Sequence, residues 1–103
     1  MQDANNLTVR DVTAALESWA PLSLQESYDN SGLLVGRNSD AVSAVLVSLD
    51  CTEAVVEEAI AVGANMIVSH HPIVFKGLKR FNGNTYVERT IMAAIANGIA
   101  LYA

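Results

Sequence analysis

The 103-residue sequence has little cysteine, little proline and few basic residues: one, two and six of them, against eleven acidic residues. Cys51 has no partner within the chain, which excludes an internal disulfide and is typical of a cytoplasmic protein. The formal net charge of −5 has the wrong sign to attract a phosphate backbone, so general nucleic-acid binding is disfavoured. No apolar run of about 18 residues occurs, and residues 1–7 carry no signal-peptide pattern, so we expect no membrane association.

Apolar residues at helical spacing predict three helices. The first follows Thr8 and is ended by Pro21, and the second follows Thr52 and is ended by Gly63. The third begins near Thr85 or Tyr86 and stops at Asn97-Gly98, where glycine suits a left-handed cap. With 51% hydrophobic and 17% charged residues, the chain has enough apolar material for one packed domain over residues 1–103.

Short apolar runs between the helices predict strands at Leu33–Val35, Val42–Leu49, Met66–Val68 and Ile99–Ala103. The run Val42–Leu49 is almost continuously apolar, as expected for a strand that is covered on both faces. Strand, helix and strand in succession predict right-handed βαβ units and a parallel sheet. We therefore expect an α/β three-layer domain. The chain ends inside an apolar run, so we also expect a truncated piece of a larger protein.

The only two histidines, His70 and His71, are adjacent and follow a predicted strand. Neighbouring side chains on an extended backbone point to opposite sides, and Pro72 favours that extended conformation at His71. One metal ion is therefore poorly placed to take both rings, whereas two neighbouring ions could take one each. The alternative interpretation is structural: one histidine packs under the following loop and the other is solvated.

Asp50 follows the neighbouring strand and is the best-placed carboxylate for such a site, where it would support a metal ligand. Its alternative role is to cap the helix that begins near Thr52. Cys51 also lies at the start of this helix, where the dipole favours a thiolate, but no independent histidine is present to activate it as a nucleophile.

Four of the six basic residues follow the histidines: Lys76, Lys79, Arg80 and Arg89. Lys76, Lys79 and Arg80 are candidate contacts for a substrate anion, and the alternative is a solvated loop edge. The chain has no glycine-rich phosphate loop, which disfavours a simple nucleotide-binding domain.

Three segments, Glu26–Leu33, Ser48–Thr52 and Ile67–Phe75, resemble in order and spacing the amino-terminal half of the NIF-three-like family, also called type-two GTP cyclohydrolase I. The resemblance extends from about Val9 to Ala103. Its most specific part is the Ser-His-His-Pro segment that follows an Ile-Val strand.

The resemblance implies a dinuclear centre of divalent ions (zinc, manganese or iron) with His70 and His71 as ligands. The family's other ligands are an aspartate beyond a strand similar to Ile99–Ala103, and a histidine and a glutamate near the carboxyl terminus. None of these three is present, so the chain carries an incomplete site. Family members form ring-shaped hexamers, which implies a homo-oligomer.

The leading hypothesis is therefore a metal-dependent hydrolase in which a bridging water is ionised to attack a carbon or phosphorus centre. Its substrate would be a small molecule, such as a nucleotide or a phosphate ester. The alternative hypothesis is a non-enzymatic regulatory or assembly module with a structural metal.

Overall fold

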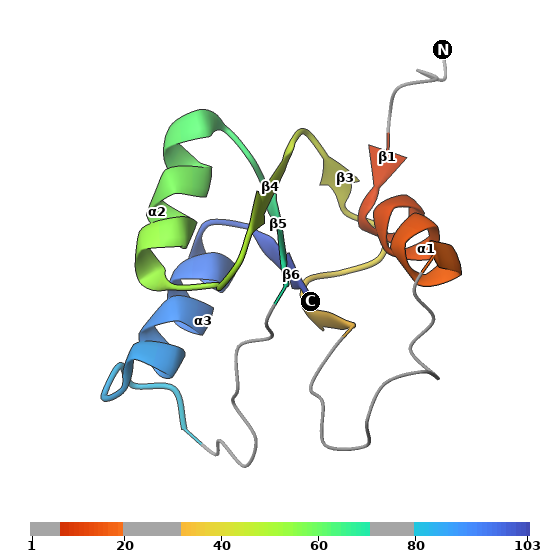
Figure 1. The fold of residues 1–103 in the computed structure, drawn as a ribbon. Helices are drawn as coiled ribbons and strands as arrows, with labels where there is room; N and C mark the ends of the chain where they lie inside the picture. Colours follow the sequence, from red (N-terminus) through yellow and green to blue (C-terminus); the bar gives the residue numbers. More distant parts are fainter. Residues whose placement is uncertain (1–6, 20–31, 71–79) are drawn as a thin grey trace.

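The computed structural model describes residues 7–19, 32–70 and 80–103. Its elements in chain order are β1 (Leu7–Thr8), α1 (Val9–Trp19), β2 (Leu33–Val35), β3 (Ala41–Val42), β4 (Val45–Ser48), α2 (Glu53–Val62), β5 (Met66–Ser69), α3 (Tyr86–Ala96) and β6 (Ala100–Tyr102). Figure 1 shows three layers, with α1 on one side of the sheet and α2 and α3 on the other. The structure confirms the α/β fold class.

The main sheet has the strand order β2-β6-β5-β4. Strands β4, β5 and β6 are parallel, and β4 and β5 run in register from Val45 opposite Met66 to Ser48 opposite Ser69. Helix α2 connects β4 to β5, which forms the predicted βαβ unit. Strand β2 adds an antiparallel edge next to β6, and β1 and β3 form a separate antiparallel pair. The carboxyl ends of β4, β5 and β6 consequently lie along one edge of the sheet.

Local capping explains where the helices begin and end. The Thr52 hydroxyl accepts a hydrogen bond from the Val55 N–H at 3.3 Å, and Gly63 ends α2 with φ of +78°. At the start of α1, Thr8 and Asp11 exchange hydrogen bonds, as their spacing predicts. Among the described residues, no helix combines the length and the apolar character needed to cross a membrane.

Each face of the sheet packs against its own helical layer. Ile67 and Leu101 face α2 and α3, while Met66 and Ala100 face α1. All four side chains are at most 3% exposed, and successive residues of a strand point to opposite faces. The sheet centre, β5 and β6, is therefore covered on both sides, as in other parallel sheets.

The prediction that Val42–Leu49 forms one strand covered on both faces is wrong in two respects. The run is interrupted at Ser43 and Ala44, between β3 and β4, where the Ser43 N–H donates to the Asn65 side-chain oxygen at 2.8 Å. The side chain of Val47 is 75% exposed. The cluster beneath α1 is built around residues of β5 and β6, so this helix leaves Val47 of the edge strand β4 uncovered.

Candidate metal centre

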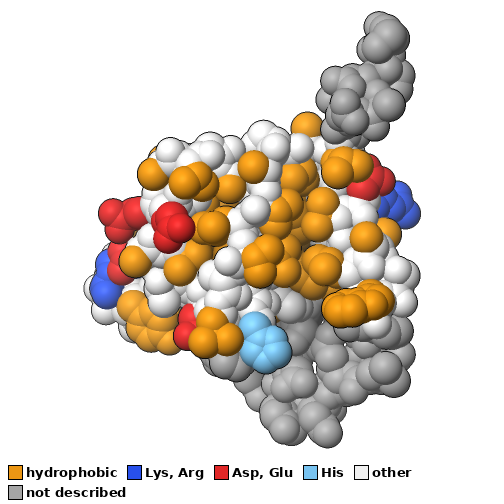
Figure 2. All heavy atoms as spheres, turned by 45° about the horizontal axis from the view of Figure 1, so that its top comes forward, with side chains coloured by type: hydrophobic (Ala, Val, Ile, Leu, Met, Phe, Trp, Pro, Cys, Tyr) orange, Lys and Arg blue, Asp and Glu red, His pale blue; other side chains and the backbone are white. Residues whose placement is uncertain are grey.

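His70 directly follows β5 and lies beside the carboxyl end of β4. Its backbone N–H donates to the Ser48 carbonyl oxygen at 3.0 Å, which extends the parallel ladder by one step beyond β5. The side chain of His70 is exposed, whereas Ser69 before it is buried. Figure 2 shows hydrophobic side chains gathered over the middle of the face that it draws. His70 therefore lies at the carboxyl edge of parallel strands, where ligands commonly bind.

Asp50 leaves the same edge of the sheet from β4. The Ser48 hydroxyl donates to the backbone carbonyl of Asp50 at 2.8 Å, which stabilises the turn between β4 and α2. The cap of α2 is Thr52, so the interpretation of Asp50 as the helix cap is wrong. Asp50 and His70 therefore follow neighbouring parallel strands, as the sequence predicts, and a role for Asp50 in supporting a metal ligand stays a prediction.

The described residues do not complete a metal site by themselves. Within residues 7–19, 32–70 and 80–103, no three of the His, Cys, Asp and Glu side chains are grouped so that they could hold an ion. A stable zinc or di-metal centre uses several nitrogen, sulfur or oxygen ligands. His70 therefore fits a metal centre only as one ligand among several, and the others would have to come from outside the described residues.

Several candidate residues lie outside the described residues, namely His71, Lys76 and Lys79. Arg80, the candidate anion contact that the structure does describe, is exposed. Arg89 has a structural role, because its guanidinium pairs with Glu53 at 3.0 Å and donates to the Gly83 carbonyl at 3.1 Å. The Arg89 charge thus links α3 to α2 rather than adding to an anion-binding patch.

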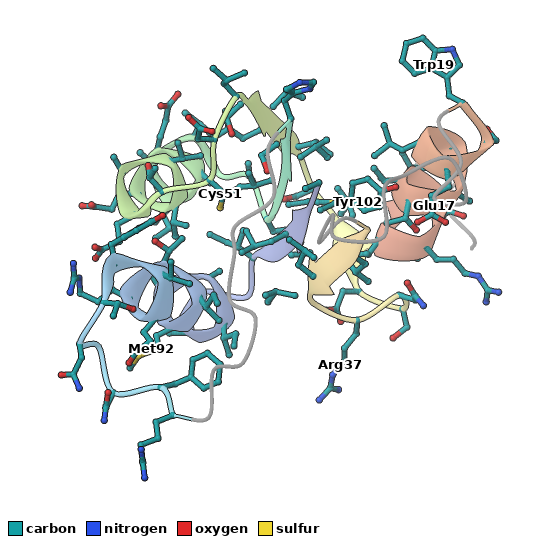
Figure 3. All side chains as sticks on the ribbon, turned by 60° about the horizontal axis from the view of Figure 1, so that its bottom comes forward. Glu17, Trp19, Arg37, Cys51, Met92 and Tyr102 are labelled. Atoms are coloured by element: carbon teal, nitrogen blue, oxygen red, sulfur yellow. The ribbon has the colours of Figure 1, made fainter. Side chains whose placement is uncertain are left out.

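The cysteine is not an activated nucleophile. Cys51 is a free thiol, 7% exposed, and packs in the cluster between the sheet and helices α2 and α3 (Figure 3). Burial raises the pKa of the Cys51 thiol to about 11, which opposes the dipole effect expected from its position before a helix. Desolvation is the larger effect here, so the thiol stays protonated at neutral pH.

One polar contact near this edge escapes sequence analysis. The Tyr102 hydroxyl on β6 donates to the Glu17 carboxylate on α1 at 3.3 Å, as the labelled side chains in Figure 3 illustrate. Burial, followed by the charge and the hydrogen bond of Glu17, raises the pKa of Tyr102 to about 12. Glu17 and Tyr102 are 85 positions apart, so no local pattern predicts their contact. Glu17 also lines a 460 Å³ groove together with Thr13, one helical turn before it.

Fold and site together define a class: a three-layer α/β protein with a histidine exposed at the carboxyl edge of its parallel strands. The family model described as Duf34/NIF3 (NGG1p interacting factor 3) matches residues 7–103. The chain belongs to this family.

Curated relatives carry the name GTP cyclohydrolase 1 type 2 homolog. The Clostridium acetobutylicum protein is 41% identical over 97 residues, and the match covers 94% of this chain and 36% of that relative. A Staphylococcus aureus protein is 41% identical over 98 residues, covering 93% of this chain and 27% of its own length. The chain thus spans about a third of the length of these relatives.

Solved structures share the fold over nearly the entire chain. Staphylococcus aureus protein SA1388 superimposes with a TM-score of 0.90 at 40% identity, covering 98% of this chain and 29% of that protein. A Bacillus cereus protein related to NIF3 gives a TM-score of 0.88 at 37% identity, covering 97% and 28%. Reduced HcgD from Methanocaldococcus jannaschii gives 0.85 at 25% identity, covering 97% and 40%.

Proposed function

We propose that this chain supplies His70 and His71 as ligands to a dinuclear divalent metal centre of a metal-dependent hydrolase. The observation that carries the proposal is the exposed His70 ring at the carboxyl edge of the parallel strands, beside Asp50 and followed in sequence by a second histidine. Relatives at 41% identity named GTP cyclohydrolase 1 type 2 homolog support the hydrolase class. The lone cysteine supports a cytoplasmic location.

Within this proposal, each residue has a defined role. His70 and His71 each hold one ion (zinc, manganese or iron), because adjacent side chains on an extended backbone point apart. Asp50 supports an imidazole by fixing its orientation. When bound, a divalent ion supplies Lewis acidity and lowers the pKa of a coordinated water. The remaining ligands come from outside the described residues.

The proposal also includes a cluster of basic residues that binds an anionic substrate. Arg80 is exposed downstream of the histidines, and Lys76 and Lys79 lie a few residues earlier in the sequence. These cations are proposed to bind a phosphate ester or the phosphates of a nucleotide, which the acidic remainder of the chain would repel.

Calorimetric titration of the chain with zinc and with manganese tests the ligand assignment. We expect His70→Ala and His71→Ala each to weaken metal binding at least tenfold, and the double variant to abolish it. Glu58→Gln, on the exposed surface of α2, removes one acidic charge and serves as the control that leaves affinity unchanged. Unchanged affinity in the double histidine variant would show that the assignment is wrong.

The hydrolase class needs a separate assay, which the Clostridium acetobutylicum relative makes possible because it has the full length. We expect metal-dependent turnover of at least one compound in a panel of phosphate esters and nucleotides, lost when the equivalent histidine pair is replaced by alanine. Metal binding without turnover of any compound would instead favour the regulatory or assembly module.

A further inference from the structure

We propose that Asn82 is a site of spontaneous deamidation, whereas the same reactive sequence at Asn97 is protected by the fold. Asparagine followed by glycine occurs twice in the chain, at Asn82-Gly83 and at Asn97-Gly98. Glycine has no Cβ, so its backbone nitrogen can approach the preceding side chain without steric hindrance. The sequence gives both sites this reactivity, and only the structure distinguishes them.

The reaction needs no reactant other than the chain and water. The Gly83 backbone nitrogen loses its proton to solvent hydroxide and attacks the side-chain carbonyl carbon of Asn82. The new C–N bond closes a succinimide ring, and the side-chain nitrogen leaves as ammonia after taking a proton from solvent. Water then opens the ring at either carbonyl and leaves an aspartyl or an isoaspartyl residue. Because a neutral amide becomes a carboxylate, the formal net charge changes from −5 to −6.

Asn97 is held in the C-cap of α3, and so is the glycine that follows it. The Asn97 side-chain amide donates to the Ala93 carbonyl oxygen at 2.8 Å. The N–H that would have to react, that of Gly98, donates to the Ile95 carbonyl oxygen at 3.2 Å. Ring closure at Asn97 would break both hydrogen bonds, so the last turn of α3 must open before the reaction can start.

Asn82 lies instead in an exposed bend outside the helix. Figure 1 shows this bend beyond the first turn of α3, at the lower left. Among the residues that the structure describes, none forms a hydrogen bond with the Asn82 side chain, and the Gly83 N–H donates to no backbone carbonyl. Gly83 adopts a φ of +81° in the bend, which glycine does without strain. The two atoms that must join at Asn82 are therefore not fixed by hydrogen bonds of a helix.

The bend is anchored beside the reacting groups rather than through them. The N–H groups of Asn82 and Asn84 donate to the Glu88 carboxylate at 3.2 and 3.3 Å. The Gly83 carbonyl oxygen accepts from the Arg89 guanidinium at 3.1 Å. The Gly83 N–H has the smallest effect among the backbone N–H groups that lower the pKa of Glu88. Ring closure at Asn82 therefore breaks no hydrogen bond within α3.

Timed incubation of the folded chain at pH 8, followed by tryptic digestion and mass spectrometry, tests the proposal. Trypsin cleaves after Arg80 and Arg89, so Asn82 and Asn97 fall on separate peptides, residues 81–89 and 90–103. Deamidation adds about 1 Da to a peptide, and about 3 Da when the incubation is done in water labelled with oxygen-18, which excludes conversion during digestion. We expect Asn82 to deamidate at least about tenfold faster than Asn97.

Unfolding and two alanine variants provide the controls. In guanidinium chloride the two sites should react at rates within about threefold of each other, because unfolding removes the cap at Asn97. Gly83→Ala should slow the reaction at Asn82 at least about tenfold, because the added Cβ hinders the approach of the nitrogen. This Cβ would lie 3.7 Å from the Arg89 Cγ, so the bend accommodates it. Gly98→Ala is the matched variant, which also replaces a glycine of positive φ and should leave the Asn82 rate unchanged.

The comparison of the two sites in the folded chain decides the proposal. An Asn97 rate equal to or above the Asn82 rate overturns it. So does an Asn82 site that stays unmodified over the time in which the unfolded chain is converted.

Discussion

Burial determines the chemistry of Cys51 at the level of the single residue. The thiol precedes α2, where the helix dipole would lower its pKa, yet desolvation in the apolar cluster raises the pKa to about 11. Because the folded pKa is raised above the ordinary value of 9.0, burying the neutral thiol stabilises the fold fully below pH 9. This contribution is lost as the pH rises toward 11.

The Cys51 thiol should therefore react slowly in the folded chain. At pH 8 we expect alkylation by iodoacetamide about 100-fold slower than in the urea-unfolded chain, because two pKa units change the thiolate fraction about 100-fold. Mass spectrometry of timed samples measures both rates. A chain with Cys51→Ser and Val62→Cys presents an exposed thiol as control, and equal rates for folded and unfolded Cys51 would contradict the account.

At the level of the element, α3 depends on a capping arrangement at its first turn. Thr85 and Glu88 exchange hydrogen bonds at 3.1 and 3.2 Å, and the Glu88 carboxylate also accepts the N–H groups of Asn82 and Asn84. The Asn82 N–H is the largest influence that lowers the Glu88 pKa below its ordinary value, and it outweighs the opposing effect of burial. The ionised carboxylate thus stabilises the turn that begins α3.

Replacing this carboxylate should remove a specific part of the pH dependence of stability. The pKa of Glu88 is lowered in the folded chain, so the ionised carboxylate stabilises the fold at and above the ordinary carboxyl range. This stabilisation is lost as the pH falls through the pKa of the folded chain. When urea unfolding is measured between pH 2 and pH 7, the free energy of unfolding should fall more steeply with decreasing pH in the unmodified chain than in Glu88→Gln. The exposed-site variant Glu58→Gln should keep the steeper profile, and identical profiles for all three chains would contradict this role.

The junction of β2 and β6 depends on a glycine. Gly36 has φ of +118°, and an added Cβ would lie 2.8 Å from the Ala100 Cβ and 3.2 Å from its Cα. Gly63 also has a positive φ, of +78°, but an added Cβ there meets nothing within 4 Å. Alanine at Gly63 would therefore introduce backbone strain alone, whereas alanine at Gly36 would introduce both backbone strain and a steric overlap.

Alanine at these two positions should have unequal effects on stability. We expect Gly63→Ala to lower the free energy of unfolding by about 1 kcal/mol through backbone strain, and Gly36→Ala to lower it by about 1–3 kcal/mol more. Urea denaturation followed by circular dichroism measures both changes. Equal losses would mean that the contact with Ala100 relaxes without cost.

At the scale of the whole molecule, local sequence patterns predict where helices and strands lie better than they predict which side chains are exposed. The sequence analysis offers Thr52 as one of two candidate caps, starts the third helix near Thr85 or Tyr86 and places a strand at Leu33–Val35, because capping and periodicity depend on neighbouring residues. The exposure of Val47 depends instead on how far α1 extends across the sheet. The Glu17–Tyr102 contact depends on the packing of residues distant in sequence.

The candidate site is predictable only in part for the same reason. Periodicity and βαβ connectivity are enough to bring His70 and Asp50 to one edge of the sheet, because parallel strands end on the same side. Composition and spacing alone do not reveal that Cys51 is buried. No three ligand-type side chains are grouped among the described residues, so the ligand set that we propose extends beyond them.

Anomalous X-ray scattering at the zinc edge, from crystals of the chain grown with excess zinc, tests the central claim most directly. High metal concentration compensates for weak affinity of a partial ligand set. The account predicts an anomalous peak about 2.0–2.1 Å from a ring nitrogen of His70, at the carboxyl edge of β5. Zinc found only at other carboxylates, with none at the His70 ring, would contradict it.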